Sequence, residues 1–212
     1  MYVPEHFAEP DVAVARALIE AHSFGTLIVP RPGGVPDVAH IPFVLDADPA
    51  PLGTLRAHVA RANPIGALLA SETPVVAVFT GPHAYVSPRW YEAPRKNVPT
   101  WNFTAVHAHG IARRIDARED RLRALADLTS KHETDPSDPW SVDMADRDYV
   151  ERLLGGIVAF SIPIERFETK MKLSQNRPPV DRLRVIEGLR ERRGPDDEAI
   201  AAMIEANENR RG

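Results

Sequence analysis

Two histidines, His107 and His109, stand two residues apart in the stretch FTAVHAHGIARRI. This stretch is predicted to be a strand, so both side chains project from one face and could chelate a divalent metal ion together with a third ligand. Alternatively, the two imidazoles pack over an aromatic ring or a planar ligand. No carboxylate stands nearby at a telling spacing, so the sequence favours packing and we predict no metal site.

A second group of titratable side chains precedes a predicted helix start. Arg56, His58 and Arg61 come shortly before Asn63 and Pro64, a pair typical of an N-cap and first helical turn. The free N–H groups and dipole of a helix N-terminus attract anions, so a phosphate group could bind here. A solvated basic surface explains the same residues equally well.

His40 and Pro42 share one face of a predicted strand. Because Pro42 has no N–H to donate, this strand should lie at a sheet edge, at a bulge, or beside something that is not a strand. A ligand running along the backbone and a solvated edge strand both remain possible interpretations.

The segment KMKLSQNR, residues 170–177, brings Lys170, Lys172 and Arg177 together with Ser174, Gln175 and Asn176. These groups could donate several hydrogen bonds to an anion or to a polar ring edge. Taken alone, the segment is more typical of a connector between a strand and a helix.

Several classes of protein are excluded by what the sequence lacks. There is no cysteine, no phosphate-binding glycine loop and no GxSxG nucleophile elbow, so thiol chemistry and serine hydrolysis of that type have no support. The net charge of −4 gives no overall reason to bind nucleic acid or an anionic membrane. Without a signal peptide or an apolar run of membrane-spanning length, we predict a cytoplasmic protein with no membrane partner.

The hydrophobic periodicity predicts an α+β fold. We expect helices over 12–22, 64–72, 118–131, 146–154, 179–192 and 196–208, and strands over 26–45 (a hairpin), 52–60, 74–81, 83–87, 103–115 and 156–171. We expect the apolar run 74–81 to be buried on both faces. Six or seven mostly short strands that do not alternate strictly with helices favour a small, largely antiparallel barrel with helices outside it.

Five motifs, in order along the chain, resemble one family. They are MYVPEHF at the start, HIPF at 40–43, GPHAYVSPRWY at 81–91, NVPTWNFTAVHAHG at 97–110 and KLSQNR at 172–177. Together they are similar to the PaiB-like family, described as FMN-binding negative transcriptional regulators. The resemblance covers residues 1 to about 178, and the remaining residues match less distinctively.

The resemblance implies a split β-barrel, similar to flavin reductases and pyridoxamine-phosphate oxidases, that forms a homodimer with FMN between the subunits. The barrel domain would span 1–178, with 179–212 as a helical extension packed on it. HIPF would run beside the flavin, Arg61 and Asn63 would turn toward its phosphate, and Trp101 and Asn102 would lie near the dimer cleft. The predicted cofactor-binding residues are His40, Ile41, Pro42, Phe43, His58, Arg61, Asn63, Trp101, Asn102, Lys172 and Gln175.

One position departs from the family pattern. Phe103 stands where the family commonly has tyrosine, so a hydrogen bond from that hydroxyl is lost. We interpret 81–110 as two strands and a proline-stiffened crossover that form one wall of a cleft for a planar cofactor, because aromatic faces and imidazoles suit an isoalloxazine. The same rings would also suit a subunit interface.

The predicted function is FMN binding linked, by resemblance, to transcriptional repression. DNA is a partner by resemblance only, because the best basic helix candidate, 181–194, is interrupted by Glu187 and Glu191. Two alternatives remain: a flavin-dependent oxidoreductase acting on a small molecule, and a haem-binding barrel that uses His83, His107 or His109 as a ligand.

Overall fold

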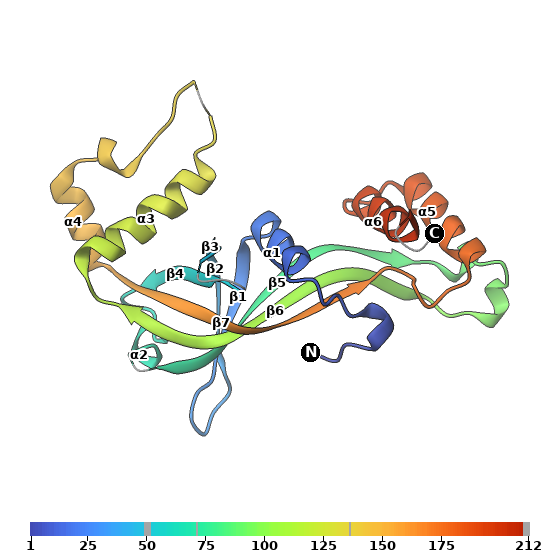
Figure 1. Cartoon of the computed structure of the whole chain (residues 1–212), viewed down its shortest axis with the longest axis horizontal. Helices are drawn as coiled ribbons and strands as arrows, with labels where there is room; N and C mark the ends of the chain where they lie inside the picture. Colours follow the sequence, from blue (N-terminus) through green and yellow to red (C-terminus); the bar gives the residue numbers. More distant parts are fainter. Residues whose placement is uncertain (49–51, 71, 136, 210–212) are drawn as a thin grey trace. The chain divides into compact units, whose positions relative to one another are not determined.

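The computed structural model describes residues 1–48, 52–70, 72–135 and 137–209 (Figure 1). These residues divide into two compact units. Unit 1 comprises Met1–Asp11, Thr80–Val106 and Glu168–Gly212. Unit 2 comprises Val12–Phe79 and His107–Phe167.

The described residues form one seven-stranded sheet in the order β2-β1-β5-β6-β7-β4-β3. Every strand pair with an assigned register is antiparallel, as the sequence predicted. The strands are β1 (Phe24–Val29), β2 (Asp37–Pro42), β3 (Val44–Asp46), β4 (Thr54–Ala60), β5 (Thr73–Val86), β6 (Thr100–Ile115) and β7 (Ile157–Lys172).

Two strands are longer than expected. β5 has 14 residues where two short strands were predicted, and β6 has 16 residues where the prediction was 103–115. β7, also of 16 residues, has the predicted length and is shifted by one residue. Pro82 was expected to lie between two strands, 74–81 and 83–87, but Gly81 and Pro82 are both buried inside the continuous strand β5. Strand pairing overrides the local turn preference of a Gly-Pro pair.

In unit 2, β1 and β2 form the predicted hairpin, with Phe24 opposite Pro42 and Val29 opposite Asp37. β2 ends the sheet order, which confirms a sheet edge, the first of the three positions that Pro42 allowed. The predicted hairpin extended to Leu45, but the chain leaves it at Phe43, whose N–H donates to the Ser23 carbonyl at 2.9 Å. The following residues form β3, which pairs with β4 instead.

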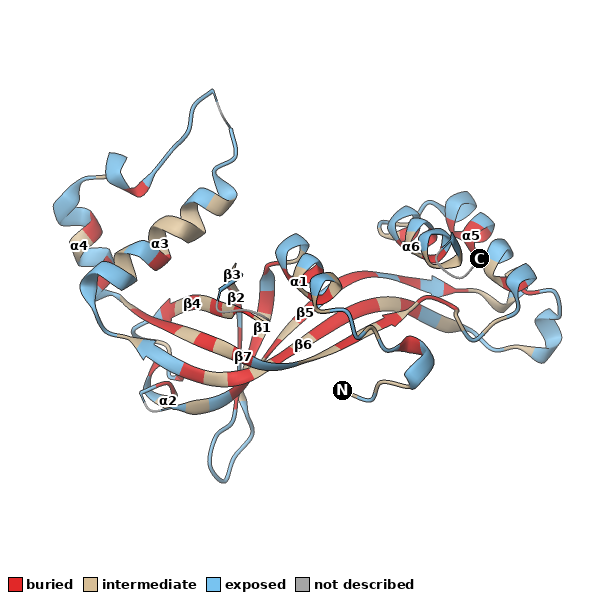
Figure 2. Ribbon diagram, in the orientation of Figure 1, coloured by how far each residue is buried: buried red, intermediate tan, exposed pale blue. Residues whose placement is uncertain are grey.

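Burial in unit 2 alternates along the strands, which places one face of the sheet against the core (Figure 2). In β4, Leu55, Ala57 and Val59 are buried, whereas Thr54, Arg56 and His58 are half-buried. The run 74–81 was expected to be buried on both faces, yet Val76 and Val78 are only half-buried. This part of β5 therefore has one core face and one partly open face.

The helices of unit 2 follow the predicted positions. They are α1 (Val12–Ala21), α2 (Ile65–Leu68), α3 (Arg118–His132) and α4 (Arg147–Gly155). α2 is shorter than the predicted 64–72, of which residue 71 lies outside the described residues. α3 and α4 share a small apolar cluster built around Val142, Val150 and Leu154.

Unit 1 contains α5 (Pro179–Arg192) and α6 (Asp197–Asn209), which pack against each other. The turn between them lies against the edge of β5. The Asp196 carboxylate accepts a hydrogen bond from the His83 N–H at 3.1 Å, and the Arg192 guanidinium donates to the Tyr85 carbonyl at 2.8 Å. Side chains of the turn therefore form hydrogen bonds with backbone groups at the edge of β5.

Among the described residues, no helix combines the length and the apolar character needed to cross a membrane.

Candidate functional site

The predicted flavin strand lies at an open edge of unit 2. In β2, His40 is exposed and its Nδ1 lies 3.0 Å from the Thr26 hydroxyl, while Ile41 is buried. Pro42 ends the strand, and Phe43 is fully buried with its ring 5.3 Å from that of Phe79. The core side chains Ile41 and Phe43 hold the strand in place, so its outer backbone edge is the part that can meet a ligand.

The predicted phosphate residues lie at the end of β4. His58 is half-buried, and this burial lowers the pKa of its imidazole, so it is neutral at neutral pH and offers an anion no charge. Asn63 Oδ1 accepts a hydrogen bond from the Ile65 N–H at 3.0 Å, which confirms its capping role. The helix it caps has only four residues, so its dipole adds little to anion binding.

Arg61 is held by backbone carbonyl groups at the end of α4 and the start of β7. Its Nε donates to the Gly155 carbonyl and its Nη2 donates to the Ile157 carbonyl at 3.2 Å. It lines a cavity of about 240 Å³ together with Arg114 and Arg121. Neither Arg114 nor Arg121 was predicted as a site residue from the sequence. The only signal was the high density of arginines in ARRIDAREDR, and nothing local indicates that this segment folds beside residue 61.

Arg56, expected to join this cationic group, is used elsewhere. Its guanidinium forms ion pairs with Asp46 of β3 and with Asp127 of α3, and these carboxylates raise its pKa further. Arg56 thus ties β4 to its neighbours and is not available to an anion.

Trp101 and Asn102, adjacent in β6, point to opposite faces of unit 1. Trp101 is half-exposed, and its ring lies 5.6 Å from His83 and 6.2 Å from Tyr85. These three rings line a cavity of about 230 Å³ beside Arg192 and the turn between α5 and α6. An aromatic wall of this kind can stack against a planar group.

Asn102 is fully buried and donates from Nδ2 to the Ser174 hydroxyl at 2.9 Å. Ser174 has a φ of 63°, a left-handed conformation that is uncommon outside glycine. The bond therefore holds a strained residue of the connector between β7 and α5.

We predict that Asn102→Ala lowers the free energy of unfolding by about 2 kcal/mol, because the Ser174 hydroxyl loses its buried partner. Urea denaturation checks this value. Ser174→Gly is the matched variant: it loses the same bond but relieves the backbone strain, so its cost should be clearly smaller. Equal losses for the two variants would show that strain at residue 174 is unimportant.

Lys172 and Gln175 are both bonded within unit 1. Lys172 Nζ donates to the Thr100 hydroxyl at 2.5 Å, and its pKa is lowered by burial and by the neighbouring charges of Lys170 and Arg177. Gln175 accepts from the Leu173 N–H at 2.6 Å and donates to the Met171 carbonyl at 2.5 Å. The contacts of Gln175 match the connector interpretation of this segment.

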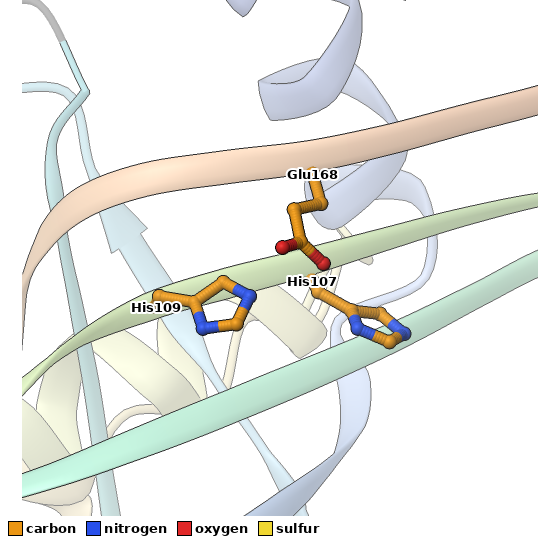
Figure 3. Close-up of side chains that lie close together, drawn as sticks. All are labelled: His107, His109 and Glu168. Carbon is orange, nitrogen blue, oxygen red and sulfur yellow. The ribbon is translucent and has the colours of Figure 1, made fainter. Parts of the chain in front are cut away.

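Figure 3 shows that His107 and His109 both project from β6. Their ring centroids are 6.3 Å apart. His109 Nδ1 lies 3.0 Å from Nη2 of Arg166, and both residues line a cavity of about 340 Å³ in unit 2. Within the described part of unit 2, no three histidine or carboxylate side chains converge as metal ligands would. Glu168, also drawn in Figure 3, belongs to unit 1.

Solved structures share the fold at low sequence identity. The FAD and heme binding protein from Mycobacterium smegmatis superposes with a TM-score of 0.60 and 16% identity, covering 77% of this chain and 72% of that chain. The flavocytochrome Anf3 from Azotobacter vinelandii gives a TM-score of 0.55 and 16% identity, covering 80% of this chain and 72% of that one. These similarities confirm the predicted fold.

A closer similarity is found in sequence. The chain is 32% identical over 205 residues to "Protease synthase and sporulation protein PAI 2" of Bacillus subtilis (strain 168), covering 97% of both chains. A family model described as "Putative FMN-binding domain" matches residues 1–166, which include β2, the Arg61 turn and the Trp101 strand. The resemblance noted from the sequence motifs is confirmed, and the chain belongs to this FMN-binding family.

Proposed function

We propose that the protein is a cytoplasmic FMN-binding homodimer with a regulatory role, and that the flavin lies along the outer edge of β2. The family match over residues 1–166 carries the proposal. The name of the Bacillus subtilis relative, which refers to protease synthesis and sporulation, supports regulation rather than a single metabolic step.

The residues of unit 2 fit the two ends of FMN. The outer backbone groups of β2 suit the polar edge of the flavin ring, and the half-buried Pro42 offers it apolar surface. Arg61 supplies a guanidinium for the phosphate, and among the described residues its Nη1 makes no hydrogen bond. When bound, FMN supplies a ring that accepts a hydride or single electrons.

Two exposed apolar side chains support the homodimer. Phe24 and Val38 are 70% and 55% exposed, and both lie on the outward face of the hairpin formed by β1 and β2. Large aromatic and aliphatic groups on a sheet surface are typical of interfaces. Sedimentation of the full chain tests this proposal, and a monomer at micromolar concentration would contradict it.

The charges of α5 bear on how regulation could work. Arg182, Arg190 and Arg192 are all ion-paired with carboxylates of α6. A helix in which three of the four arginines, all but Arg184, are paired with carboxylates is poorly suited to bind phosphates of DNA. We therefore propose that any regulatory action does not use α5 as a DNA-reading helix.

Titration of FMN with the purified chain tests the central proposal. We expect quenching of flavin fluorescence at micromolar protein, and an absence of quenching would contradict it. Arg61→Glu should weaken FMN binding by about 100-fold, because a charge reversal beside a dianion costs about 3 kcal/mol. Riboflavin, which has no phosphate, should lose less than about threefold in affinity.

Arg123→Glu provides the matched control, since it makes the same charge change at an exposed position of α3. It should leave the affinities for both flavins unchanged. Equal losses of FMN and riboflavin in Arg61→Glu would show that the phosphate binds elsewhere.

A further inference from the structure

We propose that unit 2 contains a site for a phosphomonoester dianion, formed by Arg61, Arg114 and Arg121. The inference deepens the proposed function, because Arg61 belongs to both, but the site itself is argued from the geometry of the cavity. Two sources of the dianion share this chemistry: the phosphate of FMN and a separate phosphorylated ligand.

The first support is the convergence of three guanidinium groups on one cavity of about 240 Å³. Arg61 comes from the turn after β4, Arg114 from the end of β6, and Arg121 from the first turns of α3. Like charges repel, so their convergence costs free energy unless an anion compensates it. Asp116 is the single carboxylate among the residues that line the cavity.

The second support is a buried donor of Arg121 that has no acceptor. Nη1 of Arg121 donates to the Leu154 carbonyl at 3.1 Å, but its Nε is buried and makes no hydrogen bond. A buried N–H of a charged group without a partner is costly. An anion in the cavity that Arg121 lines would offset this cost through its charge.

The third support is the way the arginines are positioned. Two donors of Arg61 are anchored on the Gly155 and Ile157 carbonyls, and Arg121 is anchored on the neighbouring Leu154 carbonyl. Each guanidinium has five N–H donors in a fixed fork, so anchored ones still have donors to offer. Preorganised arginines of this kind suit the oxygens of a phosphate.

Asp116 and Glu151 limit the positive charge at the site. Asp116 pairs with Arg114 Nε at 2.8 Å but is 75% exposed, so an entering dianion can displace it at little cost. Glu151 is paired with Arg118, outside the residues that line this cavity. Removing the charge of Asp116 should therefore strengthen anion binding.

The test compares Arg114→Gln and Arg121→Gln with Arg113→Gln in the full-length chain. Arg113 neighbours Arg114 but is paired with Glu72, so it makes the same charge change outside the cavity. Inorganic phosphate and pyrophosphate are titrated by thermal shift at constant ionic strength, and FMN and riboflavin by fluorescence. Circular dichroism confirms that each variant is folded.

We expect phosphate or pyrophosphate to bind about tenfold more weakly to both cavity variants, about tenfold more tightly to Asp116→Asn, and unchanged to Arg113→Gln. If FMN affinity falls in parallel while riboflavin affinity does not, the dianion is that of the flavin. If FMN affinity is unchanged, the ligand is a separate phosphorylated molecule.

Equal binding of phosphate, pyrophosphate and FMN by the cavity variants and the wild-type chain would overturn the inference. A wild-type chain that binds phosphate at this cavity but no FMN would contradict the proposed function and leave the anion site supported. The two proposals can therefore fail separately.

Discussion

Gly110→Ala is expected to lower the free energy of unfolding by about 3 kcal/mol or more, since it forces β6 away from β7. A Cβ at this position would overlap the carbonyl oxygen of Pro163 and lie 2.8 Å from Cγ2 of Ile162. Both neighbours belong to β7, and backbone atoms of a paired strand cannot move alone. Urea denaturation monitored by circular dichroism measures the loss.

Gly155→Ala is the matched control. It makes the same chemical change at the last residue of α4, where an added Cβ meets nothing within 4 Å. Alanine favours helix over glycine, so this variant should be neutral or slightly more stable, by up to about 1 kcal/mol. If Gly110→Ala were as stable as Gly155→Ala, the two strands would have to be further apart than described.

Asp197→Asn is expected to destabilise the C-terminal helices by about 2 kcal/mol, because a buried carboxylate loses its charge beside Arg192. Asp197 is 2% exposed and accepts hydrogen bonds from Arg192 Nε at 2.8 Å and from the Gly194 N–H at 2.7 Å. Arg192 is itself 35% exposed, so water screens part of the loss. Thermal unfolding of the two proteins at pH 7 measures the difference.

The pH dependence identifies the charge as the cause. The hydrogen bond from Arg192, followed by that from the Gly194 N–H, holds the pKa of Asp197 below its usual value. A carboxyl group with a lowered pKa in the folded state stabilises the protein above its unfolded-state pKa of about 4. This contribution is lost as the pH falls through the folded-state pKa.

The difference between the wild-type chain and Asp197→Asn should therefore shrink below about pH 4. Asp196→Asn is the neighbouring control. The Asp196 side chain is 38% exposed and accepts a hydrogen bond from the His83 N–H. Its effect should be no more than about 1 kcal/mol. A wild-type advantage over Asp197→Asn that stays constant down to pH 2 would contradict the assignment.

Periodicity predicted most elements to within one or two residues, because helices and strands here have clear apolar faces. Pro42 alone pointed to a sheet edge as one position for β2, because proline has no N–H to donate to a neighbouring strand. The continuity of β5 through Gly81 and Pro82 could not be predicted in this way. It depends on strand neighbours that are distant in the sequence.

The surroundings of the site residues were less predictable than their positions. Asn63 caps a helix as local chemistry requires, whereas the anchoring of Arg61 on Gly155 and Ile157 joins residues more than ninety positions apart. Arg121 reaches the same cavity only because α3 and α4 fold back on each other. Single-residue chemistry predicts the first kind of contact, and only the tertiary fold determines the second.

The bonds from Asp196 and Arg192 to the edge of β5 have a consequence for how the molecule behaves at high concentration. An unprotected strand edge is a template to which a strand of another molecule can add, and such addition leads to aggregation. Here side chains at the turn between α5 and α6 occupy the His83 N–H and the Tyr85 carbonyl, so these two groups cannot pair with an added strand. The C-terminal helices thus protect this part of the β5 edge, whatever ligand the barrel binds.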